Sequence, residues 1–143
     1  YIEIDSGPYL VQPTDKAFDK GERPLNVDQS NVVWLSAADA VRVAGTYVRM
    51  AYLWGDPADG KLHGSMLKLP ADFSGKIRTD ATTFKAIIID GTVSYEHNKD
   101  ARKLEAGSYF GSTGDFEHHI SLNQNREATL YIRSSNRYEI LPD

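Results

Sequence analysis

Apolar and polar residues follow the two-residue period of β-strands along much of this chain. Residues 46–54 alternate well enough for one long strand, and residues 62–69 form the next one after a turn-rich segment at 55–60. Further short apolar runs follow, separated by Gly, Asn, Asp or Ser, at residues 84–89, 92–95, 109–110, 118–122, 128–132 and 138–141. Short strands at such spacing predict an antiparallel sandwich or barrel.

The less regular segments add little helix to this picture. Residues 31–35 are a short apolar run and predict a strand, after which Ser36 could cap a single helical turn over residues 36–40. Residues 99–106 could form one or two helical turns, but their apolar content is too thin to anchor a helix, so strand and loop are favoured. Asp90 and Gly91 are expected to form a tight hairpin turn, with Gly91 supplying the positive φ.

The strand pattern also predicts a core between two sheets. Each buried Leu or Ile contributes about 1.5–3 kcal/mol, so the apolar runs need a covered face. The residues expected in this core are Leu67, Ile87, Ile89, Ile120, Leu130 and Ile132.

The beginning of the chain resembles its end. Residues 1–13 and 131–142 share Tyr-Ile, then Ser, then Tyr, an aliphatic residue and Pro. One interpretation is that residues 1–13 are the closing strands of a preceding repeat, or an added edge strand, which should pair with a sheet; the other is coincidence between two edge strands. Residues 14–30 are polar, contain Gly and Pro, and are interpreted as a linker, which leaves residues 31–143 as the domain. The missing initial Met fits a fragment or a processed product.

Composition excludes several classes of function. The chain has 143 residues, enough for one domain, and a net charge of −4 without a basic stripe, so nucleic acid is not an expected partner. No apolar run approaches the ~20 residues of a membrane span, so we expect a soluble protein. The absence of Cys excludes disulfides and thiolate chemistry and leaves the compartment open, including export after removal of a signal peptide.

Four segments share a common pattern of turns, namely residues 53–57 (Leu-Trp-Gly-Asp-Pro), 68–73 (Lys-Leu-Pro-Ala-Asp-Phe), 87–92 (Ile-Ile-Ile-Asp-Gly-Thr) and 104–110 (Leu-Glu-Ala-Gly-Ser-Tyr-Phe). In these segments the chain resembles the cupin superfamily, the RmlC-like jelly-roll barrels. The resemblance implies an all-β double-stranded β-helix, a cupin jelly roll of two antiparallel sheets. The chain is most similar to an uncharacterised tandem-cupin (bicupin) family that is distantly similar to the cupin of the ChrR-type anti-sigma factor.

The metal motif of the cupins is degenerate in this chain. The first cupin motif has two His and one Glu before a Gly, and counted back from Gly91 these positions hold Arg78, Asp80 and Phe84. Metal ligands need lone pairs, which the side chains of Arg and Phe do not offer. The resemblance therefore implies no tightly bound metal and no cofactor.

The second motif would supply its last ligand from His118 or His119. In a strand, His118 shares a face with Phe116 and Ile120, so His118 should point into the barrel and His119 away from it. The other two histidines are expected to be exposed, His63 beside a turn and His97 in a polar loop.

The candidate site residues are therefore Arg78, Asp80 and His118. They could form a partly buried ion pair between Arg78 and Asp80 beside a hydrogen-bonded His118. Alternatively they could line a remodelled cavity that binds a small polar or anionic ligand, with Arg78 as the anion contact. No catalytic residue is identified.

Two functions remain open. The favoured one is a non-enzymatic cupin domain, the structural or ligand-binding half of a bicupin, whose partner is a companion cupin domain or a second copy. The alternative is a metal-dependent cupin enzyme of the dioxygenase, isomerase or hydrolase type. The count of inward-facing ligands separates them, since catalytic metal sites use about three protein ligands.

Overall fold

The structure is a computed structural model that describes residues 2–3, 25–26, 28–36, 48–57, 60–98, 100–123 and 125–143. It divides into two compact units, Tyr1–Val32 and Val33–Asp143. In the first unit, strand β1 (Ile2–Glu3) pairs antiparallel with β2 (Leu25–Asn26), and a short 3₁₀ helix, η1 (Gln29–Asn31), follows.

The partner of β1 thus lies in the segment that the sequence analysis interpreted as a linker. The pairing expected for residues 1–13 is seen for their second and third residues, and the others lie outside the described residues. The origin of this segment in a preceding repeat stays a prediction. In the same way, of the helical turn expected at residues 36–40 only Ser36 is described.

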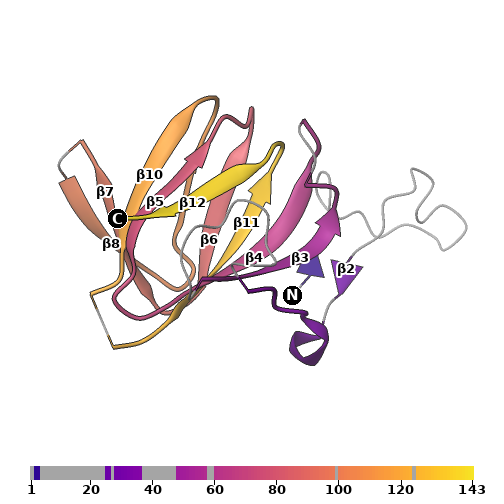
Figure 1. Ribbon diagram of the computed structural model, residues 1–143, viewed down its shortest axis with the longest axis horizontal. Helices are drawn as coiled ribbons and strands as arrows, with labels where there is room; N and C mark the ends of the chain where they lie inside the picture. Colours follow the sequence, from indigo (N-terminus) through magenta and orange to yellow (C-terminus); the bar gives the residue numbers. More distant parts are fainter. Residues whose placement is uncertain are drawn as a thin grey trace, which may run out of the picture. The chain divides into compact units, whose positions relative to one another are not determined.

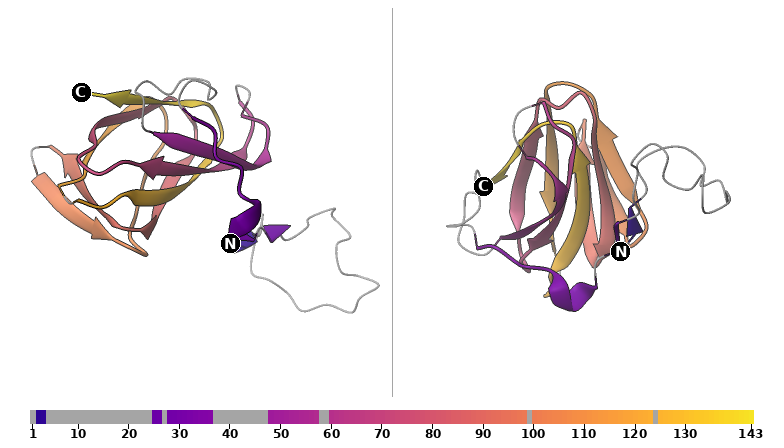
Figure 2. Two further views of the ribbon diagram at one scale, coloured as in Figure 1. Left: turned by 60° about the horizontal axis from the view of Figure 1, so that its bottom comes forward. Right: turned by 90° about the vertical axis from the view of Figure 1, so that its right-hand side faces the viewer.

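The second unit contains two five-stranded antiparallel sheets, which face each other in Figures 1 and 2. The first sheet has the strand order β3-β4-β11-β6-β9, and the second has the order β12-β5-β10-β7-β8. The strands are β3 (Arg49–Gly55), β4 (His63–Leu69), β5 (Ser74–Thr79), β6 (Phe84–Asp90), β7 (Thr92–His97), β8 (Asp100–Glu105), β9 (Tyr109–Ser112), β10 (Phe116–Ser121), β11 (Ala128–Ser134) and β12 (Tyr138–Pro142). The expected all-β fold of two antiparallel sheets is confirmed.

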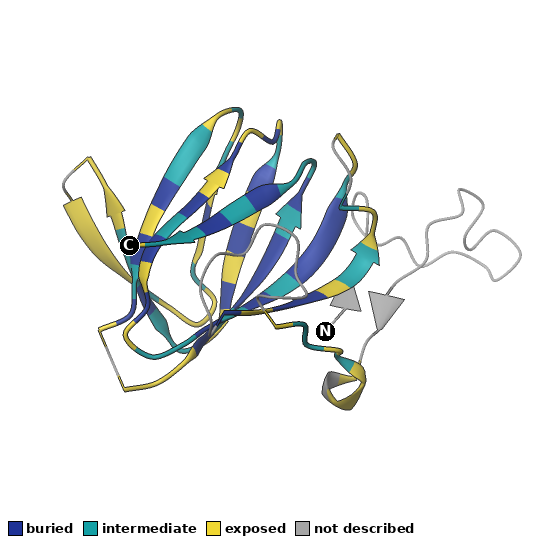
Figure 3. Ribbon diagram, viewed as in Figure 1, coloured by how far each residue is buried: buried dark blue, intermediate teal, exposed yellow. Residues whose placement is uncertain are grey.

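Alternation along the strands builds a single core between the sheets, visible as dark blue bands in Figure 3. Four of the six predicted core residues are buried as expected: Leu67, Ile120, Leu130 and Ile132. The structure adds inward-facing residues of β5 and β12, notably Ile77 and Ile140.

The prediction was wrong for Ile87 and Ile89, which are 38% and 44% exposed. Strand β6 instead turns Phe84, Ala86 and Ile88 into the core. This strand is apolar on both faces from Ala86 to Ile89, so its sequence pattern does not fix which face is covered.

Two further expectations concern local structure. Gly91 does have a positive φ, 84°, but β6 and β7 belong to different sheets, so the turn joins the sheets and is not a hairpin. Residues 100–105 form strand β8, as favoured over a helix.

Among the described residues, no helix has the length and apolar character needed to span a membrane.

Candidate functional site

His118 lies in the middle of β10 and is fully buried with its side chain between the sheets. Its neighbour His119 points the other way, and 54% of that side chain is exposed. The predicted orientation of these two residues is confirmed.

Both ring nitrogens of His118 are hydrogen-bonded to hydroxyl groups. The Tyr95 hydroxyl lies 2.9 Å from Nδ1, and the Ser112 hydroxyl lies 3.0 Å from Nε2. A neutral imidazole has one donor and one acceptor, and a hydroxyl can serve as either, so both contacts can be satisfied at once. The imidazole has no lone pair left over for another group.

Aromatic rings enclose the same imidazole. Phe84 stacks on it with 5.0 Å between ring centroids and 23° between planes, while Phe110 and Phe116 approach with centroids at 5.0 and 4.7 Å. Phe84 is the residue that the cupin resemblance places at a carboxylate ligand position. A fully buried phenyl ring stands there instead.

This environment lowers the pKa of His118 to about 4. Burial is the largest cause because it penalises the charged form, and the charge of His97 acts in the same direction. Burial also raises the pKa of the Tyr95 phenol. At neutral pH the cluster is therefore an uncharged network of one imidazole and two hydroxyls.

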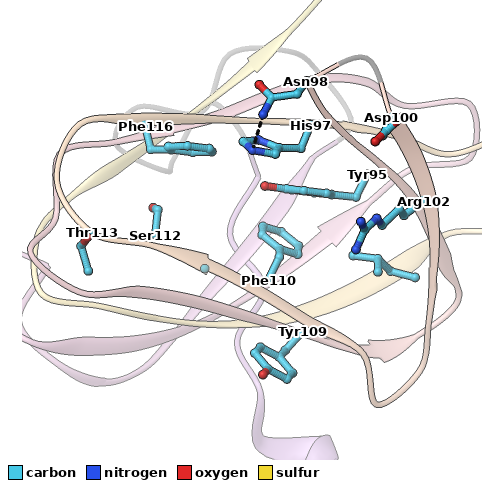
Figure 4. A pocket seen from close by; sticks show the side chains of 12 residues that line it. Tyr95, His97, Asn98, Asp100, Arg102, Tyr109, Phe110, Ser112, Thr113 and Phe116 are labelled. Carbon is cyan, nitrogen blue, oxygen red and sulfur yellow. Dashed lines mark hydrogen bonds between the residues drawn. The ribbon is translucent and has the colours of Figure 1, made fainter.

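A pocket of about 650 Å³ adjoins this network, and Figure 4 shows its lining side chains. It lies among strands β7, β8, β9 and β10, where β8 and β9 are the edge strands of the two sheets. The lining residues are Tyr95, His97, Asn98, Asp100, Arg102, Leu104, Tyr109, Phe110, Gly111, Ser112, Thr113 and Phe116. Its volume is within the ~300–1,000 Å³ typical of small-molecule sites.

The cation in this pocket is Arg102. It stands opposite Tyr95 in the β7–β8 ladder, so the two side chains share the inward face, and Figure 4 shows them side by side. Asp100 is likewise opposite His97. Within the described parts of the chain, no ion pair occupies the guanidinium of Arg102.

The structure does not bring the three predicted site residues together. Arg78 lies on the outer face of β5, where it pairs with Glu139, and Asp80 is exposed and accepts a hydrogen bond from the Asn136 side chain at 2.9 Å. The expected ion pair between Arg78 and Asp80 is therefore wrong. Neither residue lines the pocket, and a role of Arg78, Asp80 or His118 in ligand binding stays a prediction.

The residues around His118 do not fit a metal ion. The inward-facing neighbours of Arg78 on β5 are Ile77 and Thr79, which add no imidazole or carboxylate. Across the ranges that the structure describes, no group of three His, Asp or Glu side chains is placed to hold a metal. The chain has no Cys to replace them.

Ser112 and His118 are at the distance of a nucleophile and its base, but the pair is poorly suited to acyl transfer. A base with a pKa of about 4 takes up a proton weakly at neutral pH. The third member, Tyr95, is an uncharged phenol and cannot stabilise an imidazolium as a carboxylate does.

Of the two remaining histidines, which were both expected to be exposed, only His97 is exposed. His63 was expected to be exposed and is instead buried, because it begins β4 with its ring stacked on Tyr138 at 6.1 Å and its Nδ1 3.2 Å from the Lys61 carbonyl oxygen. His97 is exposed as expected, and it stacks on Phe116 at the pocket.

The residues that line the pocket were not predicted as site residues from the sequence. Arg102 and Lys103 are adjacent basic residues in the sequence, and only its place in register with Tyr95 distinguishes Arg102 from Lys103. The alternation of β8 could have marked Arg102 and Leu104 as sharing a face. It could not have shown which face is inward, because five of the six strand residues are exposed.

Solved structures with a similar fold identify the class of the jelly roll. An RmlC-like cupin protein from Ralstonia eutropha JMP134 is 18% identical, with 81% of this chain and 71% of that chain covered and a TM-score of 0.61. A protein of unknown function with a cupin-like fold from the same organism is 17% identical (83% and 77% covered, TM-score 0.61), and KdgF from Halomonas sp. is 13% identical (77% and 92% covered, TM-score 0.59). The chain thus has the cupin fold.

The family follows from the sequence model. Residues 1–141 match the family described as domain of unknown function DUF4437, and the chain belongs to that family. No curated protein matches the chain.

Proposed function

We propose that this cupin domain binds a small anionic molecule in the pocket among β7, β8, β9 and β10, without a metal ion at His118. The proposal depends on the position of Arg102. Its side chain lines the pocket on the inward face of β8 and forms no ion pair with any described residue. A guanidinium in such a place offers a planar set of donors that matches a carboxylate or phosphate.

The environment of His118 supports binding without a metal. In cupin enzymes of the alternative kind, this residue would ligate the metal together with side chains of the first motif. Here its nitrogens are engaged by Tyr95 and Ser112, and Phe84 covers one face of the ring. A metal at either nitrogen would have to replace one of these hydrogen bonds, and Phe84 offers no lone pair at the position of the carboxylate ligand, so the metal-dependent enzyme is not favoured.

We also propose that the domain works beside a second cupin domain, as one half of a bicupin or in a homodimer. The support is the likeness between residues 1–13 and residues 131–142, which form part of β11 and β12 in the second unit. The distant similarity to the ChrR-type cupin stays a prediction. Mass spectrometry of the intact native protein, which counts domains and copies, tests this part.

A pair of charge variants tests the binding site. Arg102→Gln removes the pocket cation, whereas Lys103→Gln removes the same charge from the next residue of β8, where the lysine pairs with Glu105 at 2.8 Å. In ¹H–¹⁵N NMR spectra, acetate, phosphate, glucuronate and benzoate are titrated into each protein.

We expect at least one of these anions to give saturable shifts in β7 to β10 of the wild type and of Lys103→Gln. Arg102→Gln should lose them. Equal responses of the two variants, or the absence of a saturable response to any anion, would contradict the proposed function.

A further inference from the structure

The chemistry of the pocket wall narrows the ligand further. We infer that the pocket takes a planar aromatic carboxylate, with its carboxylate on Arg102 and its ring against the wall of Tyr95, Phe110 and Phe116. This inference rests on the proposed function, because it names the class of anion that the same pocket would hold.

Aromatic rings from three strands form this wall. Tyr95 of β7 and Phe110 of β9 pack with ring centroids 4.9 Å apart, and Phe116 of β10 stacks against His97 at 5.7 Å with 27° between planes. Figure 4 shows Phe116, His97, Tyr95 and Arg102 following one another across the pocket. Aromatic rings prefer offset-stacked or edge-on contact with other rings, so a flat apolar ligand gains more here than a bulky one of equal area.

The position of the cation fits an acid whose carboxylate is attached directly to a ring. Arg102 and Tyr95 are opposite each other in register, which places their Cβ atoms about 4.5–5.5 Å apart. Figure 4 shows the Arg102 side chain beside the Tyr95 ring, so a carboxylate bound by the guanidinium can lie next to the aromatic wall. Asp100, two residues earlier on the same face, repels a carboxylate placed at the His97 end and so favours the orientation towards Arg102.

Hydroxyl-rich acids fit the wall less well. Tyr95 and Ser112 already share their hydroxyls with His118, and the Asn98 side chain is 3.0 Å from the ring of His97. A sugar acid would also bury several of its hydroxyls against the phenyl rings of Phe110 and Phe116, which offer no hydrogen-bond partner. Polar groups that lose water without gaining a partner weaken binding.

The test is isothermal titration calorimetry with four probes: benzoate, cyclohexanecarboxylate, acetate and benzylammonium. Benzoate and cyclohexanecarboxylate have the same charge and similar size, and differ in planarity and aromatic character. Benzylammonium keeps the ring and reverses the charge. Each probe is titrated into the wild type, Arg102→Gln, Lys103→Gln and Phe116→Leu.

We expect benzoate to bind the wild type about threefold or more tightly than cyclohexanecarboxylate, and more tightly still than acetate. Arg102→Gln should weaken benzoate about tenfold to a hundredfold, as loss of a charge-assisted contact does, while Lys103→Gln changes its affinity less than about twofold. Phe116→Leu should remove the preference for benzoate over cyclohexanecarboxylate, and circular dichroism of each variant verifies its fold.

The other outcomes separate the two claims. Equal affinity for benzoate and cyclohexanecarboxylate, or tighter binding of benzylammonium, would overturn the aromatic carboxylate. If benzoate and cyclohexanecarboxylate bound equally well and Arg102→Gln weakened the binding of both, the proposed anion site would stand. Carboxylate affinities that Arg102→Gln and Lys103→Gln leave equally unchanged would overturn both.

Discussion

Two histidines of this domain are equally buried and have opposite relations to the pocket. His118 is held by Tyr95 and Ser112, and both of these hydroxyl-bearing residues line the pocket. His63 stacks on Tyr138, and neither of these two residues lines the pocket. Burial and residue type are the same at the two positions, so neither identifies a functional histidine.

The two histidines differ in whether the polar residues around them line the pocket. The Tyr138 hydroxyl is 2.6 Å from the Ser65 hydroxyl, and all of Tyr138, Ser65 and His63 are buried. This second cluster only satisfies polar groups inside the core. The cluster of His118 satisfies polar groups too, but the residues that bear its hydroxyls also line the pocket, which makes it the cluster beside a ligand.

The largest expected effect comes from the ring that joins the two clusters. Phe84 is fully buried, stacks on His118 and meets Tyr138 edge-on at 5.8 Å. Phe84→Ala should lower the free energy of unfolding by about 3–5 kcal/mol, as loss of a core phenyl ring does. Urea denaturation measures this change. Tyr109→Ala, at a side chain that is 76% exposed, should change it by less than about 0.5 kcal/mol, and a similar cost for both variants would contradict the role of Phe84.

A second effect is the pH dependence of stability that the burial of His118 produces. The pKa of His118 is lowered to about 4 in the folded state, against about 6.5 when unfolded, so the unfolded chain binds the extra proton first. The stability is fully present above about pH 6.5 and falls as the pH drops towards 4, with a loss on the order of 2–3 kcal/mol at pH 4.5.

Urea denaturation at pH 7 and at pH 4.5 measures this dependence in the wild type and in His118→Gln, whose side chain cannot take up the proton. The difference between the two pH values should be smaller in the variant by about the stated amount. An NMR titration that gave His118 an ordinary pKa would contradict the prediction.

Two substitutions of Tyr by Phe compare the His118 and His63 clusters with a smaller loss of stability. Tyr95→Phe removes the hydroxyl at Nδ1 of His118, and Tyr138→Phe removes the hydroxyl at Ser65. Each should lower the free energy of unfolding by about 1–2 kcal/mol. Only Tyr95→Phe should shift the ring nitrogens of His118 in ¹⁵N spectra, and a shift of equal size in Tyr138→Phe would show that the clusters are not separate.

The smallest effect is expected outside both clusters. Arg78 is half-exposed and pairs with Glu139 on the outer face of the sheet. Arg78→Gln should cost at most about 1 kcal/mol, as surface ion pairs do, and should leave anion binding unchanged. Loss of anion binding in this variant would restore Arg78 as the anion contact that the sequence suggested.

The sequence predicted the fold well where one face of a strand is polar. Leu130 and Ile132 of β11 alternate with Thr129 and Arg133, and both were placed in the core correctly. The prediction was wrong for β6 because the outer face of this strand is also apolar, with Ile87 and Ile89. Strand β5 was not predicted, since Ile77 is its one large apolar residue.

The site was less predictable for a related reason. The inward direction of His118 followed from alternation with Phe116 and Ile120, whereas Arg78 was placed by its position in a family motif and lies on the outer face. The pocket is lined by residues of β7, β8, β9 and β10, which come from both sheets, and β8 and β9 are the edge strands of these sheets. Strand order is a property of the folded chain that local patterns do not encode.

The central claim is that His118 is hydrogen-bonded beside an anion pocket and is not a metal ligand. The most direct measurement follows the ¹⁵N resonances of its imidazole while one equivalent of zinc, and then benzoate, is added at neutral pH. We predict a neutral ring whose resonances are unchanged by zinc, and amide shifts in β7 to β10 on adding benzoate. A zinc-induced shift of the His118 nitrogens, with no response to benzoate, would contradict the account.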